Sequence, residues 1–200
     1  MNVLQSDALL IVYVDVKSPY AFAAIRPTLT LEVELGMKFD WRPLTLDIPS
    51  YLGSAEKKEG KVVASSGRSA KVWNAIRYSY GDARRYAKRQ GLILKGIEKI
   101  WDSSTANIGI LWVVEQDRDK LGRYFEAIFP SFWKRELDIE DVQVVKSCLT
   151  EAGIDSDGFD DFQSGEGRVR HDDLQPQFHP HGIYGVPTYV TLLKMNSPIS

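Results

Sequence analysis

The chain has 200 residues, enough for one large domain or two small ones with a substantial hydrophobic core. Its composition, 44% hydrophobic and 26% charged, excludes a disordered tail, a collagen-like repeat and a disulfide-stapled miniprotein. The formal net charge of -2 lacks the basic excess typical of proteins that bind nucleic acid or anionic membranes, so a small molecule is the favoured partner.

The first 44 residues predict a strand, a helix and a second strand. Residues 8–16 are almost entirely apolar, which is typical of a strand buried on both faces. Ser18 is a favoured helix N-cap, so a helix is predicted from there to Gly36, with a kink at Pro27. Residues 37–44 alternate in hydrophobicity as a second strand. This order predicts a βαβ crossover and therefore an α/β sheet.

The middle of the chain is predominantly helical. Residues 47–66 are polar and predict a loop that borders a site. Four helices are then predicted from apolar residues at spacings of three and four, over residues 70–90, 104–115, 121–133 and 138–152. Residues 183–193, which are β-branched and aromatic, predict a last strand.

The only cysteine, Cys148, excludes an internal disulfide, a CxxC redox pair and a cysteine-based metal cage within one chain. It falls on an apolar helical stripe, where we expect a small buried side chain. The longest apolar stretch, residues 103–114, is shorter than the ~20 residues of a membrane-spanning helix. Asp15 and Lys17 interrupt the N-terminal apolar segment, which argues against a signal peptide. We therefore expect a cytoplasmic protein.

Two short motifs at opposite ends of the chain are the strongest candidates for a site. Ser18-Pro19-Tyr20 begins a helix, and the unpaired N–H groups of a helix N-terminus stabilise anions. Gly185-Val186-Pro187-Thr188 precedes a strand, and a cis Val186–Pro187 bond would leave the backbone of Val186 free to pair with an extended peptide. Each motif alone is more often a plain cap or turn. Such a cis bond would suit a peptide-like ligand.

A known thioredoxin-like family has the same order of segments: VYVDVKSPYAF, FDWRPL, a helical region, FWKRELDIEDVQVVKSCLTEAGID and GIYGVPTYV. It contains bacterial DsbA-type proteins, kappa-class glutathione transferases and 2-hydroxychromene-2-carboxylate isomerases, and the chain resembles the isomerase branch most, over about residues 10–190. The resemblance implies an α/β fold with a thioredoxin-like sheet, residues 1–65 and 183–200, and a large all-helical insertion, residues 66–182. DsbA-type oxidoreductases carry a CxxC where this chain has Ser18, so dithiol exchange is excluded.

The resemblance also implies glutathione as the cofactor. Ser18 would hydrogen-bond the glutathione sulfur and lower its pKa, while Val186, ahead of a cis Pro187, would pair with the tripeptide; Pro19 and Tyr20 would complete the binding site. In the isomerase reaction the thiolate adds reversibly to an unsaturated pyruvate-like acid, permits rotation about the former double bond and leaves. A kappa-type transferase and a non-catalytic protein of the same fold stay as alternatives.

Two further positions carry over from the family less cleanly. Tyr78, four residues before Asp82, is expected to line the site, although an aromatic residue on an amphipathic stripe is more often part of the core. Asp102, with Ser103, falls where the family often has an Asn-Thr pair, so an amide is replaced by a charge. This substitution leaves the identity of the substrate open.

Imidazole and carboxylate groups near the C-terminus would suit zinc or iron, namely His171, Asp172, Asp173, His179 and His181. Their spacing fits no standard ligand pattern, and Pro176 and Pro180 interrupt any helix that could align them. We therefore expect a surface loop without a metal.

The C-terminus is expected to be short. Thirteen residues, 188 to 200, follow Pro187, whereas the partner strand and last helix of the resembling family need about 25. The strand around Tyr189 should then present an unpaired edge and an uncovered apolar face, which proteins usually cover by association. We therefore expect a homo-oligomer and weaker glutathione binding than in a complete family member.

Overall fold

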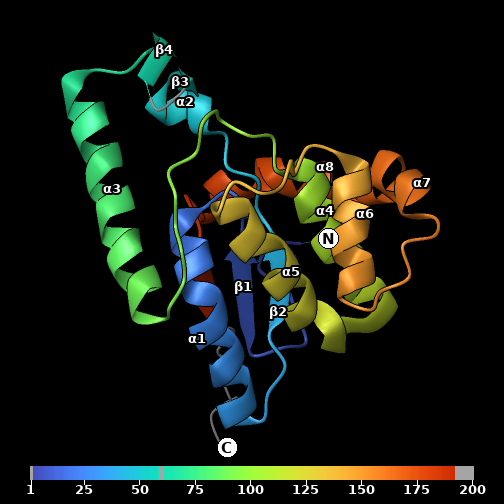
Figure 1. The fold of residues 1–200 in the computed structure, drawn as a ribbon. Helices are drawn as coiled ribbons and strands as arrows, with labels where there is room; N and C mark the ends of the chain where they lie inside the picture. The colour runs from blue at the N-terminus through green and yellow to red at the C-terminus, as the bar shows by residue number, and fades with distance from the viewer. Residues whose placement is uncertain (1, 59–60, 192–200) are drawn as a thin grey trace, which may run out of the picture.

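The computed structural model describes residues 2–58 and 61–191. Three strands form the main sheet: β1 (Leu10–Val14), β2 (Asp40–Pro43) and β5 (Thr188–Thr191). Their order is β2-β1-β5, with β2 parallel and β5 antiparallel to β1. The fully apolar segment is thus the central strand, as predicted, and α1 (Pro19–Leu35) joins the two parallel strands (Figure 1).

Helices cover both faces of the sheet. Val12 and Val14 of β1 belong to the large hydrophobic core that includes residues of α1, α4 (Ser104–Asp117) and α5 (Leu121–Trp133). Ile11 and Tyr13, on the opposite face, pack with Leu174 and Phe178 of α8 (Glu166–Phe178). Helix α8 therefore covers this face of β1.

The helical region also contains α3 (Ala70–Arg89), η1 (Arg118–Lys120), α6 (Val142–Glu151), α7 (Phe159–Ser164) and η2 (His179–His181). Figure 1 shows α3 beside α1, at the edge of the molecule away from α6 and α7. The predicted helix over 138–152 begins later, because the side chain of Asp141 caps it by accepting from the backbone nitrogen of Gln143 at 2.8 Å. The division of the chain into two domains stays a prediction.

The predicted loop over residues 47–66 is wrong. This segment forms a short helix, α2 (Ile48–Leu52), and an antiparallel hairpin, β3 (Ser54–Lys58) and β4 (Lys61–Ser66). The hairpin is formed by backbone pairing, and its described side chains are largely exposed. The sequence therefore lacks the apolar alternation that predicts a half-buried strand.

The predicted surface loop around the histidines is also wrong. The segment forms α8 and η2, and α8 continues through Pro176. The lost backbone hydrogen bond is offset by burial, because Leu174 and Phe178 on either side of the proline are fully packed against the sheet.

Strand β5 lies at the edge of the described sheet. Tyr189 is partly exposed, and its hydroxyl forms a hydrogen bond of 2.6 Å with the hydroxyl of Thr28 on α1. The predicted shortening of the C-terminus concerns residues 192–200, which lie outside the described residues. The predicted homo-oligomer therefore stays a prediction. Among the described helices, none is both long and apolar enough to cross a membrane.

Candidate functional site

Ser18 occupies the junction between β1 and α1. Its backbone is extended and its Oγ accepts a hydrogen bond from the backbone nitrogen of Ala21 at 3.2 Å, while Pro19 fills the first helical position. Ser18 thus caps α1 as the sequence predicted. The residue is only 2% exposed and contributes to the wall of a cavity.

The two sequence motifs meet directly. The Val186–Pro187 peptide bond is cis, which confirms that prediction. The Ser18 hydroxyl donates a hydrogen bond of 3.2 Å to the backbone carbonyl of Val186, 168 residues further along the chain. Because Ser18 Oγ also accepts from Ala21, both of its hydrogen-bonding functions are engaged by backbone groups.

A cavity of about 470 Å³ lies above this contact. Its wall includes Ser18, Pro19, Tyr20 and Val186, four of the residues expected to bind the cofactor. Pro187 adjoins the wall through its bond to Val186. The remaining walls come from α2, the hairpin, α3 and residues 96–100. The wrongly predicted loop does border this cavity, through residues of α2 and β3.

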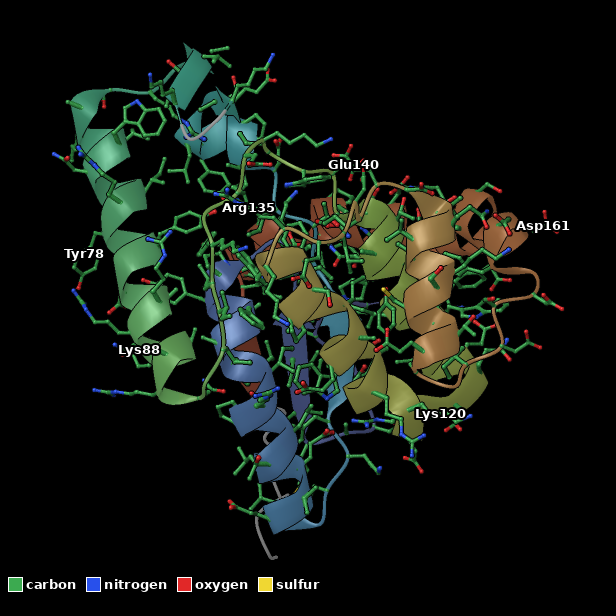
Figure 2. The ribbon with its side chains drawn as sticks, in the orientation of Figure 1. Tyr78, Lys88, Lys120, Arg135, Glu140 and Asp161 are labelled. Carbon is green, nitrogen blue, oxygen red and sulfur yellow. The ribbon has the colours of Figure 1, made fainter. Side chains whose placement is uncertain are left out.

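Tyr78 lies outside the cavity. Its side chain is 67% exposed and points away from the body of the molecule on the outer face of α3 (Figure 2). Tyr80 lines the cavity instead, because residues two apart on a helix point to nearly opposite faces. Asp82 accepts a hydrogen bond of 3.1 Å from the hydroxyl of Tyr20 and so joins α3 to the start of α1.

Asp102 also lies outside the cavity wall. Its carboxylate accepts a hydrogen bond of 2.9 Å from the backbone nitrogen of Ser104 at the start of α4. Burial acts to raise the pKa of this carboxyl, but the hydrogen bonds from Ser104 and the charges of Lys17 and Arg168 outweigh it, so the pKa is lowered. Asp102 is therefore an ionised group that shapes α4 rather than a direct contact with the cavity.

The cavity wall carries a strong excess of positive charge. Five cationic side chains line it, against the single carboxylate of Glu98: Lys17, Arg68, Arg77, Arg84 and Lys99. The whole chain, by contrast, has a net charge of -2. A cavity with this lining attracts anionic ligands.

Arg68 and the tyrosines of the wall add polar donors to apolar surface. The guanidinium of Arg68 lies 4.8 Å from the ring centre of Trp73 and donates to the carbonyl of Gly53 at 3.1 Å, and burial lowers its pKa. Burial raises the pKa of Tyr51 and of Tyr80 to about 12, so both hydroxyls stay protonated at neutral pH. The sequence analysis missed these residues, which no short motif marks.

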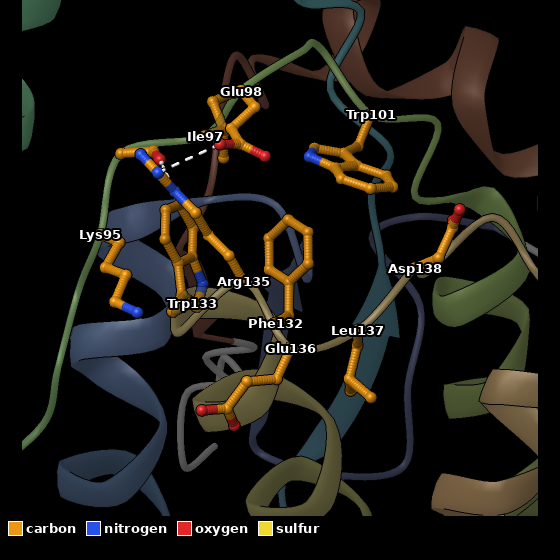
Figure 3. Close-up of a pocket in the computed structure, with 11 residues that line it drawn as sticks. Lys95, Ile97, Glu98, Trp101, Phe132, Trp133, Arg135, Glu136, Leu137 and Asp138 are labelled. Atoms are coloured by element: carbon orange, nitrogen blue, oxygen red, sulfur yellow. Dashed lines mark hydrogen bonds and ion pairs between the residues drawn. The ribbon is translucent and has the colours of Figure 1, made fainter. Parts of the chain in front are cut away.

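A second, smaller cavity of about 270 Å³ lies beside the first and shares Gly96, Ile97 and Glu98 with it. Figure 3 shows Arg135 reaching across to Glu98, at 3.2 Å, beside the ring of Phe132. Neither sequence motif reaches this cavity, so the candidate site is the larger one.

The histidines show no arrangement for a metal. His171 is buried on α8, where its ring nitrogens contact Thr45 Oγ1 at 2.8 Å and Asp172 Oδ1 at 2.7 Å. His179 packs edge-on against Tyr184, and His181 contacts the carbonyl of Gln177. Within residues 2–58 and 61–191, no three His, Cys, Asp or Glu side chains are grouped to hold a metal ion.

Cys148 is buried on α6, as predicted, and we expect it to be unreactive in the folded protein. Burial raises the pKa of its thiol from 9.0 to about 11, so at pH 8 its thiolate fraction, and with it the rate of alkylation by iodoacetamide, should fall about 100-fold. Mass spectrometry after timed labelling, with and without urea, measures this rate. Equal labelling in both conditions would contradict the buried position.

Comparison with known proteins adds solved structures of similar fold. No curated protein matches the sequence. A 2-hydroxychromene-2-carboxylate isomerase is 18% identical, with a TM-score of 0.66 over 90% of this chain and 83% of its own. A putative protein disulfide isomerase from Nitrosomonas europaea is 14% identical, with a TM-score of 0.69 over 96% and 87% of the two chains.

The cytosolic disulfide reductase DsbM from Pseudomonas aeruginosa is 14% identical, with a TM-score of 0.64 over 94% of this chain and 86% of its own. DsbM has also been solved with GSH, and that structure matches at 16% identity, with a TM-score of 0.59 over 90% and 84%. At these identities the structures share the fold, a thioredoxin-like sheet with a helical insertion. Residues 9–196 match the family described as the DSBA-like thioredoxin domain, and the chain belongs to that family.

Proposed function

We propose that the protein is a glutathione-dependent enzyme of the isomerase type, acting on an unsaturated aromatic or polyketide-like acid. The observation that carries this proposal is the hydrogen bond between Ser18 Oγ and the carbonyl of Val186 at the base of a cation-lined cavity. It puts a hydroxyl donor, a helix N-terminus and a backbone acceptor at one point, which are the groups that a peptide thiol requires.

The residues of the cavity fit glutathione. Glutathione has two carboxylates, which the guanidinium groups of Arg68, Arg77 and Arg84 complement, and a peptide backbone, which the polar groups of Val186 can pair with. The volume of about 470 Å³ lies within the range of small-molecule sites. The structure of DsbM with GSH, of the same fold, adds support.

When bound, glutathione would supply a thiolate that adds reversibly to the double bond of the substrate and leaves after rotation about that bond. Ser18 has one hydroxyl proton, which it donates to the carbonyl of Val186. With a thiolate present, the same proton would turn to the sulfur, and the freed carbonyl of Val186 would accept from the ligand's peptide N–H. The N-terminus of α1 would further stabilise the negative charge.

Two other thiol reactions are less well supported. Dithiol exchange requires two neighbouring cysteines, and Cys148 is both the only one and buried in α6. Irreversible conjugation, as in a kappa-type transferase, would use the same residues and differs only in the fate of the product. The solved isomerase of this fold favours the reversible reaction.

Calorimetry with glutathione, followed by an isomerisation assay with 2-hydroxychromene-2-carboxylate and saturating glutathione, tests the proposal. We expect binding, turnover and full recovery of free glutathione. Accumulation of a glutathione conjugate would instead identify a transferase. Folded protein that shows neither binding nor turnover would overturn the proposal.

A further inference from the structure

Lys17 immediately precedes Ser18 and lines the same cavity. The residue is only 7% exposed, and its Nζ donates a hydrogen bond of 3.1 Å to the backbone carbonyl of Trp101. This carbonyl is a neutral partner that satisfies one of the three donors of the ammonium group. Lys17 therefore introduces a buried positive charge beside Ser18 that the family resemblance did not predict.

The charge of Lys17 has no direct counter-ion in the described part of the chain, where no carboxylate oxygen lies within 4.0 Å of its Nζ. Lys99, on the same cavity wall, is in contrast paired with Glu140 at 2.6 Å. The carboxylate of Asp102 senses the charge of Lys17 but is bound to the start of α4. A buried ammonium without a paired anion is costly, so an anionic ligand group is the missing partner.

We propose that Lys17 is a catalytic residue whose ammonium group holds the ionised sulfur of the bound thiol ligand. This inference rests on the proposed function. On binding, the S–H bond breaks, its electron pair stays on sulfur and the proton passes to water. The Ser18 hydroxyl, the N-terminus of α1 and the Lys17 ammonium would together hold the sulfur anion.

The place of Lys17 in the wall favours the sulfur over a carboxylate of the ligand. Lys17 and Ser18 are consecutive and lie at the same junction of β1 and α1, where the thiol is expected. The cations of α3 and of the loop before it, Arg68, Arg77 and Arg84, belong to another wall. They are available for carboxylates, for which guanidinium groups are better matched than an ammonium.

The test compares glutathione with S-methylglutathione, which cannot form a thiolate, as ligands of the wild type, Lys17→Gln and Lys99→Gln at pH 7. Glutamine keeps a donor for the carbonyl of Trp101 but removes the charge. Calorimetry in two buffers of different ionisation enthalpy gives the affinity and the protons released. Ultraviolet difference absorbance reports the thiolate directly.

We expect Lys17→Gln to lose about tenfold in affinity for glutathione together with most of the proton release, because the pKa of the bound thiol should rise above 7 without the ammonium charge. Its affinity for S-methylglutathione should stay unchanged. Lys99→Gln should retain the proton release, because its charge is already neutralised by Glu140.

Unchanged proton release in Lys17→Gln would overturn the inference. Equal losses of affinity for glutathione and S-methylglutathione would also overturn it, and would place Lys17 against a carboxylate of the ligand. Wild-type protein that binds neither ligand would refute the proposed function and this inference with it. Should Lys17→Gln fail to fold, Lys17→Arg provides the decision. Arginine keeps the positive charge, so this variant must retain the proton release. Loss of the proton release in folded Lys17→Arg would contradict the role given to the charge.

Discussion

Ser18→Ala is expected to lower the kcat of the isomerisation by about 10²- to 10³-fold, the usual effect of removing one donor to a developing anion. The substitution removes the hydroxyl that donates to the carbonyl of Val186 and caps α1. Glutathione should still bind, because its carboxylates and peptide groups keep their partners. Steady-state kinetics at saturating glutathione measures the change, and calorimetry separates it from binding.

Ser69→Ala is the matched control. Ser69 caps α3 as Ser18 caps α1, with its Oγ accepting from the backbone nitrogen of Val72 at 3.3 Å, but it does not line the cavity. Both substitutions should cost about 1 kcal/mol of stability through the lost cap. Only Ser18→Ala should lose kcat. Equal activity in the two variants would show that Ser18 is a helix cap and nothing more.

The centre of the fold could be predicted because its signals are local. The apolar run that forms β1 has no polar alternation, and Ser18 followed by proline is a strong start for α1. The contact between Ser18 and Val186 joins residues 168 positions apart, which no local pattern encodes. Its prediction depended on the resemblance, through the combination of two motifs that are each weak alone.

The cavity wall could not be predicted because helix α3, which forms part of it, contributes apolar residues both to the core and to the cavity. On α3 the apolar stripe divides, so that Ala83 and Ala87 enter the core while Trp73, Ile76 and Tyr80 face the cavity. A 3.6-residue period identifies one face of a helix but not what that face contacts. The same limit explains why Tyr78 was placed wrongly.

Helix α8 shows a different limit of predicting structure from sequence. The prolines and histidines within and just after this helix suggested a loop, yet Leu174 and Phe178 lie four residues apart on the face that packs on the sheet. This spacing was the signal that could have identified the helix. Burial against Ile11 and Tyr13 outweighs the low helix propensity of Pro176, a tertiary effect that sequence alone does not show.

Asp15→Ala is expected to destabilise the protein by about 3 kcal/mol or more, because it leaves several buried donors without an acceptor. Asp15 is fully buried at the end of β1. Its carboxylate accepts from the backbone nitrogens of Lys17 and Leu46, at 3.2 and 2.8 Å, and from the side chains of Ser103 and Asn107. Urea unfolding followed by tryptophan fluorescence measures the free energy of unfolding.

Asp47→Ala is the control for this experiment, since Asp47 is exposed nearby and its side chain makes no capping hydrogen bond. It should change the stability by no more than about 0.5 kcal/mol.

Asn107→Ala removes another member of the same network, which continues from Asn107 through Thr45 to His171. Because Asp15 and Asn107 are direct partners, the double variant should lose less stability than the sum of the two single losses. Strictly additive losses would show that the Asp15 carboxylate acts on its partners at Lys17, Leu46 and Ser103 without help from this network.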